Sequence, residues 1–176
     1  MTERATDPIR PTDDEARALA RDLIDTARHG ALGVTDPATG TPMVTRIAVV
    51  PGPDGLPLTL VSTLSSHTAA LDADPACSIL LGEPGPKGDP LTHPRLTIQA
   101  RAEPVDKVAL KAHYLGHYPK AQLYYDFGDF RLMRLAPVAA FLNGGFGKAY
   151  NLTPEDLMTG DRGAAGATSA SFPPRP

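Results

Sequence analysis

The sequence has a single cysteine, Cys77, so neither a disulfide nor a cysteine-based zinc site can form within one chain. No stretch approaches the ~20 apolar residues that a helix needs to cross a bilayer. The polar N-terminal segment also lacks the apolar centre of a secretory signal. We therefore expect a cytoplasmic protein with no membrane partner.

An excess of positive charge is also missing. The chain has 17 Lys and Arg against 20 Asp and Glu, for a net charge of −3, which argues against a general nucleic-acid binder. Hydrophobic residues make up 41% and charged residues 21%, as in ordinary globular proteins. The 19 prolines and 16 glycines favour many short elements joined by tight turns over a helical bundle.

Residue periodicity predicts more strands than helices. Thr12 reads as the N-cap of a first helix, with Glu15 completing a capping box and Gly30 marking its end. Alternation of apolar and polar residues predicts the strands. We expect strands over 31–35, 42–50, 56–62, 76–82, 95–105, 130–135 and 138–143, and further helices over 66–73, 107–117 and 153–157.

These elements predict an α+β protein that is mainly antiparallel β, with a closed or nearly closed barrel and flanking helices. We expect one domain over residues 12–158, after a flexible N-terminus over 1–11. Residues 159–176 contain mostly Gly, Ala, Ser and Pro, which predicts a disordered tail. The loop over 83–94 is long enough to be either functional or disordered.

The stretch over 59–71 reads as a strand that passes through a run of hydroxyl side chains into a short helix. A helix N-terminus offers free N–H groups and a positive dipole end, which suit a phosphate. The candidate ligands are Ser62, Thr63, Ser65, Ser66, Thr68 and the imidazole of His67. The alternative is an ordinary turn with Ser66 as the N-cap and a solvent-exposed histidine.

Polar residues on the predicted strands add to this site. Arg46 stands among apolar neighbours and can bind a phosphate through two hydrogen bonds, or pair with a carboxylate at the barrel edge. Arg95 and Gln99 can orient a cofactor ring, or lie on an outward sheet face. In the loop after the last strand, Phe146 can cover a planar ring and Lys148 can approach an anion, unless this is merely a tight glycine turn.

Two other kinds of site are not expected. His113 and His117 are spaced to meet one metal ion, but no third ligand is evident, so we predict no metal site. No catalytic base or nucleophile arrangement is evident, so the catalytic residues are unknown. This fits chemistry that belongs to a bound cofactor.

Several of these blocks resemble the FMN-binding split-barrel superfamily of pyridoxamine 5′-phosphate oxidase. The matching residues are Thr45-Arg46-Ile47-Ala48, Leu60-Val61-Ser62, and His67-Thr68-Ala69-Ala70-Leu71 with Asp74-Pro75. Three further blocks are similar to the HugZ-type heme-utilisation branch: Leu81 to Pro90, Thr92 to Leu96, and Gly144 to Ala149. The resemblance implies a homodimer with FMN at the subunit interface, near Arg46 and Ile47.

The chain departs from that pattern in two places. HugZ-type proteins commonly carry a further C-terminal domain or tail with a heme-ligating histidine, whereas here no histidine follows His117. Many superfamily members also have a basic pair where this chain has Ser66-His67. The leading hypothesis is an FMN-dependent oxidoreductase acting on a small molecule. The alternatives are a heme-binding or heme-degrading HugZ-like protein and a non-catalytic cofactor carrier.

Overall fold

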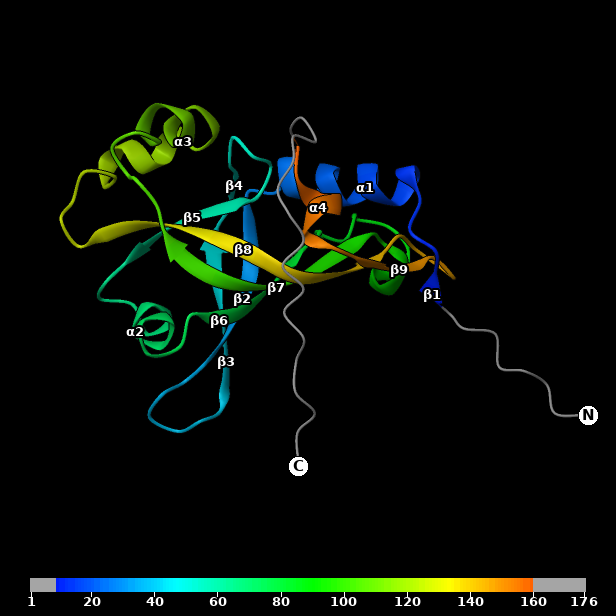
Figure 1. Cartoon of the computed structure of the whole chain (residues 1–176), viewed down its shortest axis with the longest axis horizontal. Coiled ribbons are helices and arrows are strands. Elements are labelled where there is room, and N and C mark those ends of the chain that lie inside the picture. The colour runs from blue at the N-terminus through cyan, green and yellow to red at the C-terminus, as the bar shows by residue number, and fades with distance from the viewer. Residues whose placement is uncertain (1–8, 160–176) are drawn as a thin grey trace, which may run out of the picture.

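The computed structural model describes residues 9–159, which form one sheet with helices on its flanks (Figure 1). The helices are α1 (Asp14–Asp25), α2 (Ser66–Ala73), α3 (Lys111–His117) and α4 (Pro154–Leu157), with short 3₁₀ turns at Pro90–Thr92 and Pro119–Leu123. The strands are β1 (Ile9–Arg10), β2 (His29–Thr35), β3 (Pro42–Ala48), β4 (Val50–Pro51), β5 (Pro57–Ser62), β6 (Ala76–Leu81), β7 (Arg95–Pro104), β8 (Phe130–Asn143) and β9 (Ala149–Leu152).

The sheet is mainly antiparallel and follows the order β1-β9-β8-β7-β6-β2-β3. Within the described residues only β1 and β9 pair in parallel, while β5 pairs with both β4 and the first half of β8. The sheet curves without closing, so the structure confirms the predicted split barrel with flanking helices. No helix among residues 9–159 is long and apolar enough to span a membrane.

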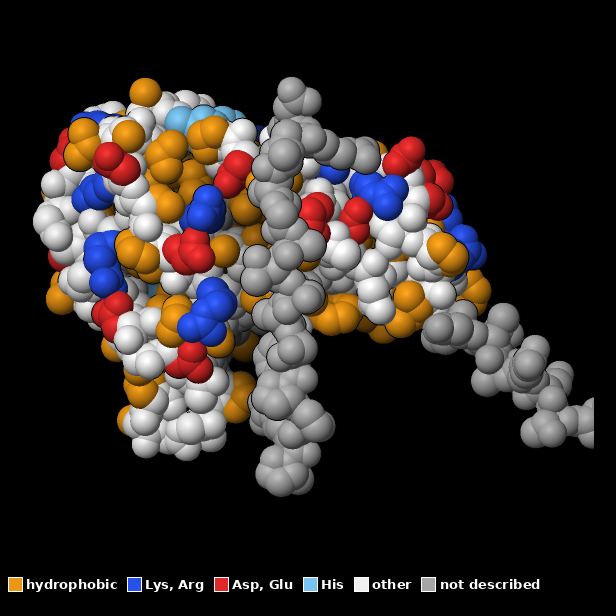
Figure 2. Space-filling view, viewed as in Figure 1, with side chains coloured by type: hydrophobic (Ala, Val, Ile, Leu, Met, Phe, Trp, Pro, Cys, Tyr) orange, Lys and Arg blue, Asp and Glu red, His pale blue; other side chains and the backbone are white. Residues whose placement is uncertain are grey.

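Two apolar clusters stabilise the fold. The larger one lies inside the curved sheet and takes Ala16, Ala20 and Ile24 from the buried stripe of α1. A smaller cluster packs α3 and the following turn, through Tyr114 and Tyr125, against Leu58 and Leu132 of β5 and β8. On the face shown in Figure 2, basic and acidic side chains are interspersed. Some of the described charged side chains form ion pairs, as Arg131 Nη2 does with Asp72 Oδ1 at 2.8 Å.

Strand β8 differs most from its predicted form. The sequence predicts two strands with a break before residue 138, whereas the structure has one strand of 14 residues. The register with β7 shifts between Gln99 and Ala100, where Ala139 and Pro137 are their partners, so Val138 is an extra bulged residue. The bulge accommodates a proline, which has no N–H to donate to the ladder.

The first helix begins one residue later than predicted. Asp13 is its N-cap and accepts a hydrogen bond from Ala16 N at 2.8 Å. Thr12 donates instead to Asn151 O at 2.6 Å, which ties the start of α1 to β9. The helix ends at Asp25, and Gly30 lies within β2. The predicted end at Gly30 is therefore wrong.

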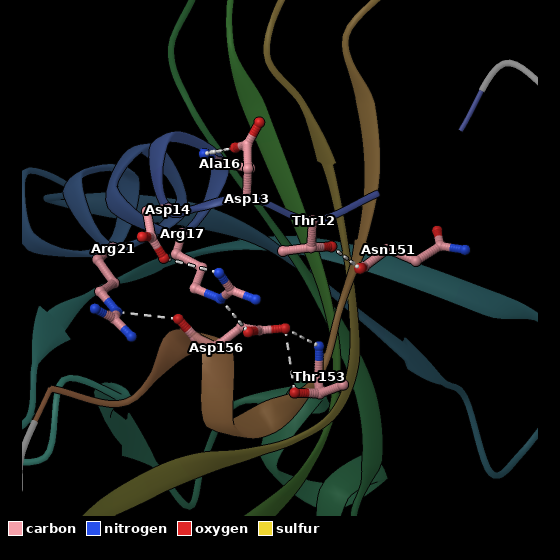
Figure 3. Close-up of polar contacts among 9 residues, drawn as sticks. All are labelled: Thr12, Asp13, Asp14, Ala16, Arg17, Arg21, Asn151, Thr153 and Asp156. Carbon is pink, nitrogen blue, oxygen red and sulfur yellow. Dashed lines mark hydrogen bonds and ion pairs between the residues drawn. The ribbon is translucent and has the colours of Figure 1, made fainter. Parts of the chain in front are cut away.

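Helix α4 is held against α1 by one carboxylate (Figure 3). Asp156 accepts from Arg17 Nε at 2.6 Å and from Thr153 N at 2.9 Å, and Arg21 Nε donates to its carbonyl at 3.0 Å. Thr153 and Asp156 form a capping box, with Pro154 in the first turn as predicted. These contacts fasten the end of the described chain to the first helix.

The described structure includes a small part of the segments that the sequence predicts to be flexible or disordered. Ile9 and Arg10 form the short strand β1 against β9, although the sequence predicts a flexible segment through residue 11. At the other end, Thr159 N donates to Asp54 O at 2.9 Å. The remainder of the predicted flexible N-terminus and disordered tail lies outside the described residues.

Candidate cofactor site

The hydroxyl-rich turn is fixed by Asp129, which lies just before β8. Ser62 is the last residue of β5 and its hydroxyl donates to Asp129 Oδ2 at 2.8 Å. The next amide, Thr63 N, donates to Asp129 O at 2.7 Å. The pairing of β5 with β8 brings these residues together across 67 positions of sequence. Asp129 therefore positions the turn, and sequence reasoning missed it because no local pattern marks it.

Helix α2 begins where predicted, but its N-cap is Ser65 and not Ser66. The Ser65 carbonyl accepts from Thr68 N and Ala69 N, while its hydroxyl makes no capping bond. The amides of Ser66 and His67 have no hydrogen-bond partner among residues 9–159. In a helix these first N–H groups point out of the N-terminus, where the dipole is positive.

His67 links this helix start to β3. Its Nδ1 lies 3.2 Å from the hydroxyl of Thr45, and the ring is half-buried. Burial lowers the pKa of His67 below its ordinary value, so the neutral ring predominates at pH 7 in the protein alone. An anion at the helix start would oppose this shift by stabilising the imidazolium. The ring therefore provides a charge that depends on whether an anion is bound.

The five candidate hydroxyls are not equivalent. The Ser62 hydroxyl already donates its hydrogen bond to Asp129, and it also accepts one from Leu64 N at 3.2 Å. Thr68 is 1% exposed, and its Oγ1 has no hydrogen-bond partner in the described structure. The hydroxyls of Thr63, Ser65 and Ser66 lie on the accessible side of the turn and make no hydrogen bond within residues 9–159. Accessible donors are thus fewer than the sequence suggests.

The side chains of Arg46 and Ile47 point to opposite faces of β3. Ile47 is 5% exposed within the barrel core, so only its main chain is available to a ligand. Arg46 is exposed and has neither an ion pair nor a hydrogen bond among the described residues. It follows Thr45 directly, so its side chain points away from the face that carries His67. Because β3 is an edge strand, the Arg46 side chain is accessible to another molecule.

Arg95 and Gln99 lie on β7, on the same outer sheet face as Arg46, but only Gln99 is free. Arg95 donates through Nη1 to Leu91 O at 2.8 Å and to His93 O at 3.4 Å, so it supports the preceding loop. Gln99 is exposed, opposite Ser78 of β6 and Ala139 of β8. This outward position is the alternative that the sequence left open.

Phe146 and Lys148 are exposed on the β8–β9 loop, where Phe146 retains 96% of its accessible surface. The hydroxyl-rich turn over 62–66 adjoins the start of β8, and the β8–β9 loop follows its end. At the usual rise per residue, the 14 residues of β8 separate the two by roughly 40 Å. Within one chain, the structure does not bring Phe146 and Lys148 to the hydroxyl-rich turn.

The outer face of the sheet carries accessible apolar side chains beside Arg46 and Gln99. Exposed fractions are 67% for Val44, 43% for Leu80, 51% for Val138 and 43% for Phe141. Apolar side chains gathered on one sheet face favour an interaction surface.

The other described features give no alternative centre. His113 Nε2 donates to Pro51 O at 2.7 Å, and no cluster of three metal-ligand residues occurs between residues 9 and 159. One shallow cavity of about 310 Å³ lies beside Lys107 and Tyr125, and another of about 330 Å³ beside Cys77. Neither is lined by a predicted site residue.

Known proteins resemble this chain in sequence and fold. The non-canonical heme oxygenase HOZ of Arabidopsis thaliana is 37% identical over 97 residues, which are 52% of this chain and 28% of that protein. The chain thus spans about a quarter of the length of that curated relative. A heme-binding protein from Mycobacterium smegmatis is 27% identical with a TM-score of 0.73, over 85% of this chain and 61% of that one. No protein-family model matches the chain.

Two further solved structures share the fold of this chain. One is 47% identical with a TM-score of 0.81, and covers 86% of this chain and 100% of its own. A pyridoxinephosphate oxidase family protein from Clostridium acetobutylicum shares the fold, with a TM-score of 0.61 at 13% identity over 83% of this chain and 99% of that one. Together with the split barrel itself, these likenesses confirm the resemblance. The chain belongs to the split-barrel superfamily of pyridoxamine 5′-phosphate oxidase, in which its named relatives include heme proteins.

Proposed function

We propose that this chain binds FMN and acts as a flavin-dependent oxidoreductase, with the flavin phosphate at the N-terminus of α2. The observation that carries the proposal is the pair of unpartnered amides, Ser66 N and His67 N, at the start of an eight-residue helix. Two such amides aligned with a helix dipole form a binding position for a phosphate.

The hydrogen-bond donors around these two amides suit a phosphate. The Ser65 and Ser66 hydroxyls adjoin the two amides, and the His67 imidazole adds a positive charge once it is protonated. The buried hydroxyl of Thr68, which has no partner, is a further polar group in the same turn. This donor set relies on hydroxyls and amides more than on fixed cations, which suits a phosphate monoester held at a turn.

We further propose that the site is completed by a second copy of the chain. Arg46 and Gln99 belong to the outer face, and Phe146 and Lys148 to a loop at the far end of β8. A homodimer packed through the outer face would cover Val44, Leu80 and Phe141 and bring the β8–β9 loop of one copy to α2 of the other. Phe146 would then cover the cofactor ring, and Arg46 and Lys148 would face its anionic groups.

In this arrangement the bound flavin would supply the electron-transfer chemistry. The chain's own groups would bind and orient it: α2 would anchor the phosphate, while Gln99 would provide a polar contact for the ring. Phe146 would exclude water from one face. We assign no catalytic base, and the substrate is a small molecule whose identity the site does not define.

Heme is the second candidate ligand, and the relatives favour it. A heme oxygenase is 37% identical over 97 residues, and a protein described as heme-binding is 27% identical over most of this chain. A heme would need an iron ligand and cations for its carboxylates. His67 and Arg46 are available for these roles, since neither makes an ion pair within the described residues. A non-catalytic carrier or sensor whose cofactor pocket has decayed is the third candidate, and cytoplasmic location stays a prediction.

The absorbance spectrum of the freshly purified protein separates the candidates. Flavin bands support the proposal, a Soret band supports heme, and a colourless protein that takes up neither added FMN nor hemin supports the carrier with a decayed pocket. Binding to riboflavin, which lacks the phosphate, provides the sharper test. We expect FMN to bind at least tenfold more tightly than riboflavin, and equal affinities would contradict the phosphate site.

Position 66 offers a matched pair of variants. Ser66→Pro removes one phosphate-facing N–H, yet proline is well tolerated at the first helical position. Ser65 already has the extended backbone that must precede a proline, with φ −85° and ψ 139°. Ser66→Ala removes only the hydroxyl. We expect Ser66→Pro to weaken FMN binding about tenfold more than Ser66→Ala, since a bond to a charged group contributes roughly 1.5 kcal/mol or more.

Arg46 provides an independent check. We expect Arg46→Ala to lose FMN, whereas Arg101→Ala, which also removes an exposed arginine from the outer face, should retain it. Unchanged flavin retention in Arg46→Ala would remove Arg46 from the site.

A further inference from the structure

The loop between β6 and β7, residues 82–94, is folded around the side chain of His93. Pro90–Thr92 makes one 3₁₀ turn within it, capped by Asp89, whose carboxylate accepts from Leu91 N at 2.9 Å. The loop has thirteen residues, but its ends meet, because Leu81 pairs with Leu96. Its conformation between these ends is held by contacts inside the loop and by two from outside it: Arg95 Nη1 donates to Leu91 O, and His29 of β2 pairs with Glu83.

The side chain of His93 makes two hydrogen bonds to the main chain of residues six and eight positions earlier in the loop. Gly85 N donates to its Nδ1 at 3.2 Å, and its Nε2 lies 2.9 Å from Lys87 O. A carbonyl oxygen only accepts, so Nε2 must carry the proton and Nδ1 must be the unprotonated acceptor. Both bonds together require the neutral ring in one tautomer.

The main chain is wrapped closely on the ring. A Cβ at Gly85 would lie 3.0 Å from His93 Cε1, and one at Gly88, where φ is +88°, would lie 3.8 Å from Nε2. Glycine at these two positions lets the segment 85–88 pass over the imidazole. The imidazole ring thus packs against segment 85–88 and supports its conformation.

Protonation would break one of these bonds. A proton on Nδ1 would face the Gly85 N–H, so a donor would oppose a donor. The charged groups of the loop are Glu83, Lys87 and Asp89, and Glu83 pairs with His29 of β2, with Oε1 and Nδ1 3.4 Å apart. Arg95 of β7 donates through Nη1 to His93 O. No described carboxylate forms an ion pair with His93 that would compensate for the new charge.

We propose that His93 is a proton-sensitive clasp that holds loop 82–94 closed while its ring is neutral and releases it when the ring is protonated. Histidine side chains commonly change charge between pH 5 and 8. Closure matters beyond the loop, because a Cβ at Gly145 would lie 3.2 Å from Thr92 O. The clasp therefore supports the β8–β9 loop that carries Phe146 and Lys148.

The consequence for ligand binding rests on the proposed function, but the clasp itself does not. With the full chain and no cofactor, backbone ¹⁵N relaxation at pH 8.0 and pH 5.5 would measure the order of residues 85–92. We expect order parameters near 0.85 at pH 8.0, which fall below about 0.6 at pH 5.5. The ring ¹⁵N shifts should report the Nε2–H tautomer at the higher pH.

Two variants make the test specific. His93→Gln keeps an acceptor and a donor at similar spacing but cannot take up a proton, so its loop should stay ordered at both pH values. His93→Ala should be mobile at both. An ordered loop in the wild type at pH 5.5, or the same loss of order in His93→Gln, would refute the clasp. A failed FMN titration with intact pH-dependent order would refute only the proposed function.

Discussion

Replacing Asp156 with alanine should destabilise the protein by about 2.5 kcal/mol at pH 7. Its carboxylate accepts three hydrogen bonds, from Arg17 Nε, Thr153 N and the Thr153 hydroxyl at 2.6, 2.9 and 3.2 Å. The Asp156 side chain is 14% exposed and that of Arg17 31%. A partly buried charge-assisted bond contributes about 1.5 kcal/mol, and loss of a capping side chain costs about 1 kcal/mol.

The cost should not exceed this, because Arg17 keeps a partner. Asp14 Oδ1 lies 2.9 Å from Arg17 Nη1, so removal of Asp156 leaves no uncompensated buried charge. The ion pair between Arg17 and Asp14 also provides the control variant. Asp14 is 98% exposed, so Asp14→Ala should change the free energy of unfolding by less than about 0.5 kcal/mol.

The pH dependence gives a second measure. Burial by itself would raise the pKa of the Asp156 carboxyl, but the bonds from Arg17 and Thr153 together lower it below its usual value. The carboxylate therefore stabilises the fold above about pH 4 and loses this contribution as the pH falls through its lowered pKa. The stability difference between wild type and Asp156→Asn should shrink over that range.

Urea denaturation followed by circular dichroism measures these differences. A shift of the midpoint without a change in slope indicates a change in stability alone. If Asp156→Ala costs no more than Asp14→Ala, or if the stability difference is undiminished as the pH falls below about 4, then Asp156 does not fasten α4 to α1 in the way argued above.

Three further predictions follow from single residues. Burial raises the pKa of the Cys77 thiol to about 11, so a disulfide reagent at pH 8 should react about a hundredfold more slowly than with a free thiol. Gly82→Ala should destabilise by about 2 kcal/mol, since φ is +106° and its Cβ would lie 2.5 Å from Pro94 O; Gly40→Ala, at φ +70° in open space, should cost about 1 kcal/mol. Because burial lowers the pKa of His67 and a phosphate would raise it, FMN should bind more tightly as the pH falls from 8 to 6, while riboflavin and the His67→Gln variant should show no such trend.

Local patterns predicted most of the secondary structure. Helix α2 has its predicted bounds, and most strands begin or end within a few residues of the expected positions. The errors arise where tertiary contacts override a local signal. Thr12 resembles an N-cap but bonds to Asn151, and Pro137 resembles a strand break but lies beside a bulge. Sequence reasoning also missed β9, whose four residues pair with the end of β8.

The candidate site was less predictable than the fold. The hydroxyl-rich turn before α2 could be located because a hydroxyl run before a helix is a local feature. The partners that decide which groups remain accessible are distant: Asp129 occupies Ser62, and Thr45 reaches His67 from β3. Arg95 was expected at a cofactor, yet its guanidinium bonds to loop carbonyls. Strand pairing determines such contacts, and no short pattern encodes it.

The separation of the two halves of the proposed site leads to a final prediction. If α2 of one copy and the β8–β9 loop of the other hold one cofactor, Ser66→Pro and Phe146→Ala impair different chains of the same site. A dimer reassembled from one chain of each variant would then hold one site with both defects and one with neither. We expect such mixed dimers to regain about half of the wild-type flavin content, although each variant alone binds weakly.

This outcome depends on the site being shared. If each chain held its own cofactor, every site in the mixed dimer would still contain one defect, and mixing would restore nothing. Refolding the two variants together, with differently tagged chains so that mixed dimers can be isolated, allows flavin absorbance to be measured per chain. Phe146 is 96% exposed in the single chain, so its removal should not disturb folding and serves as the internal check. Recovery would therefore locate the cofactor between chains, and its absence would refute the shared site even if FMN binds.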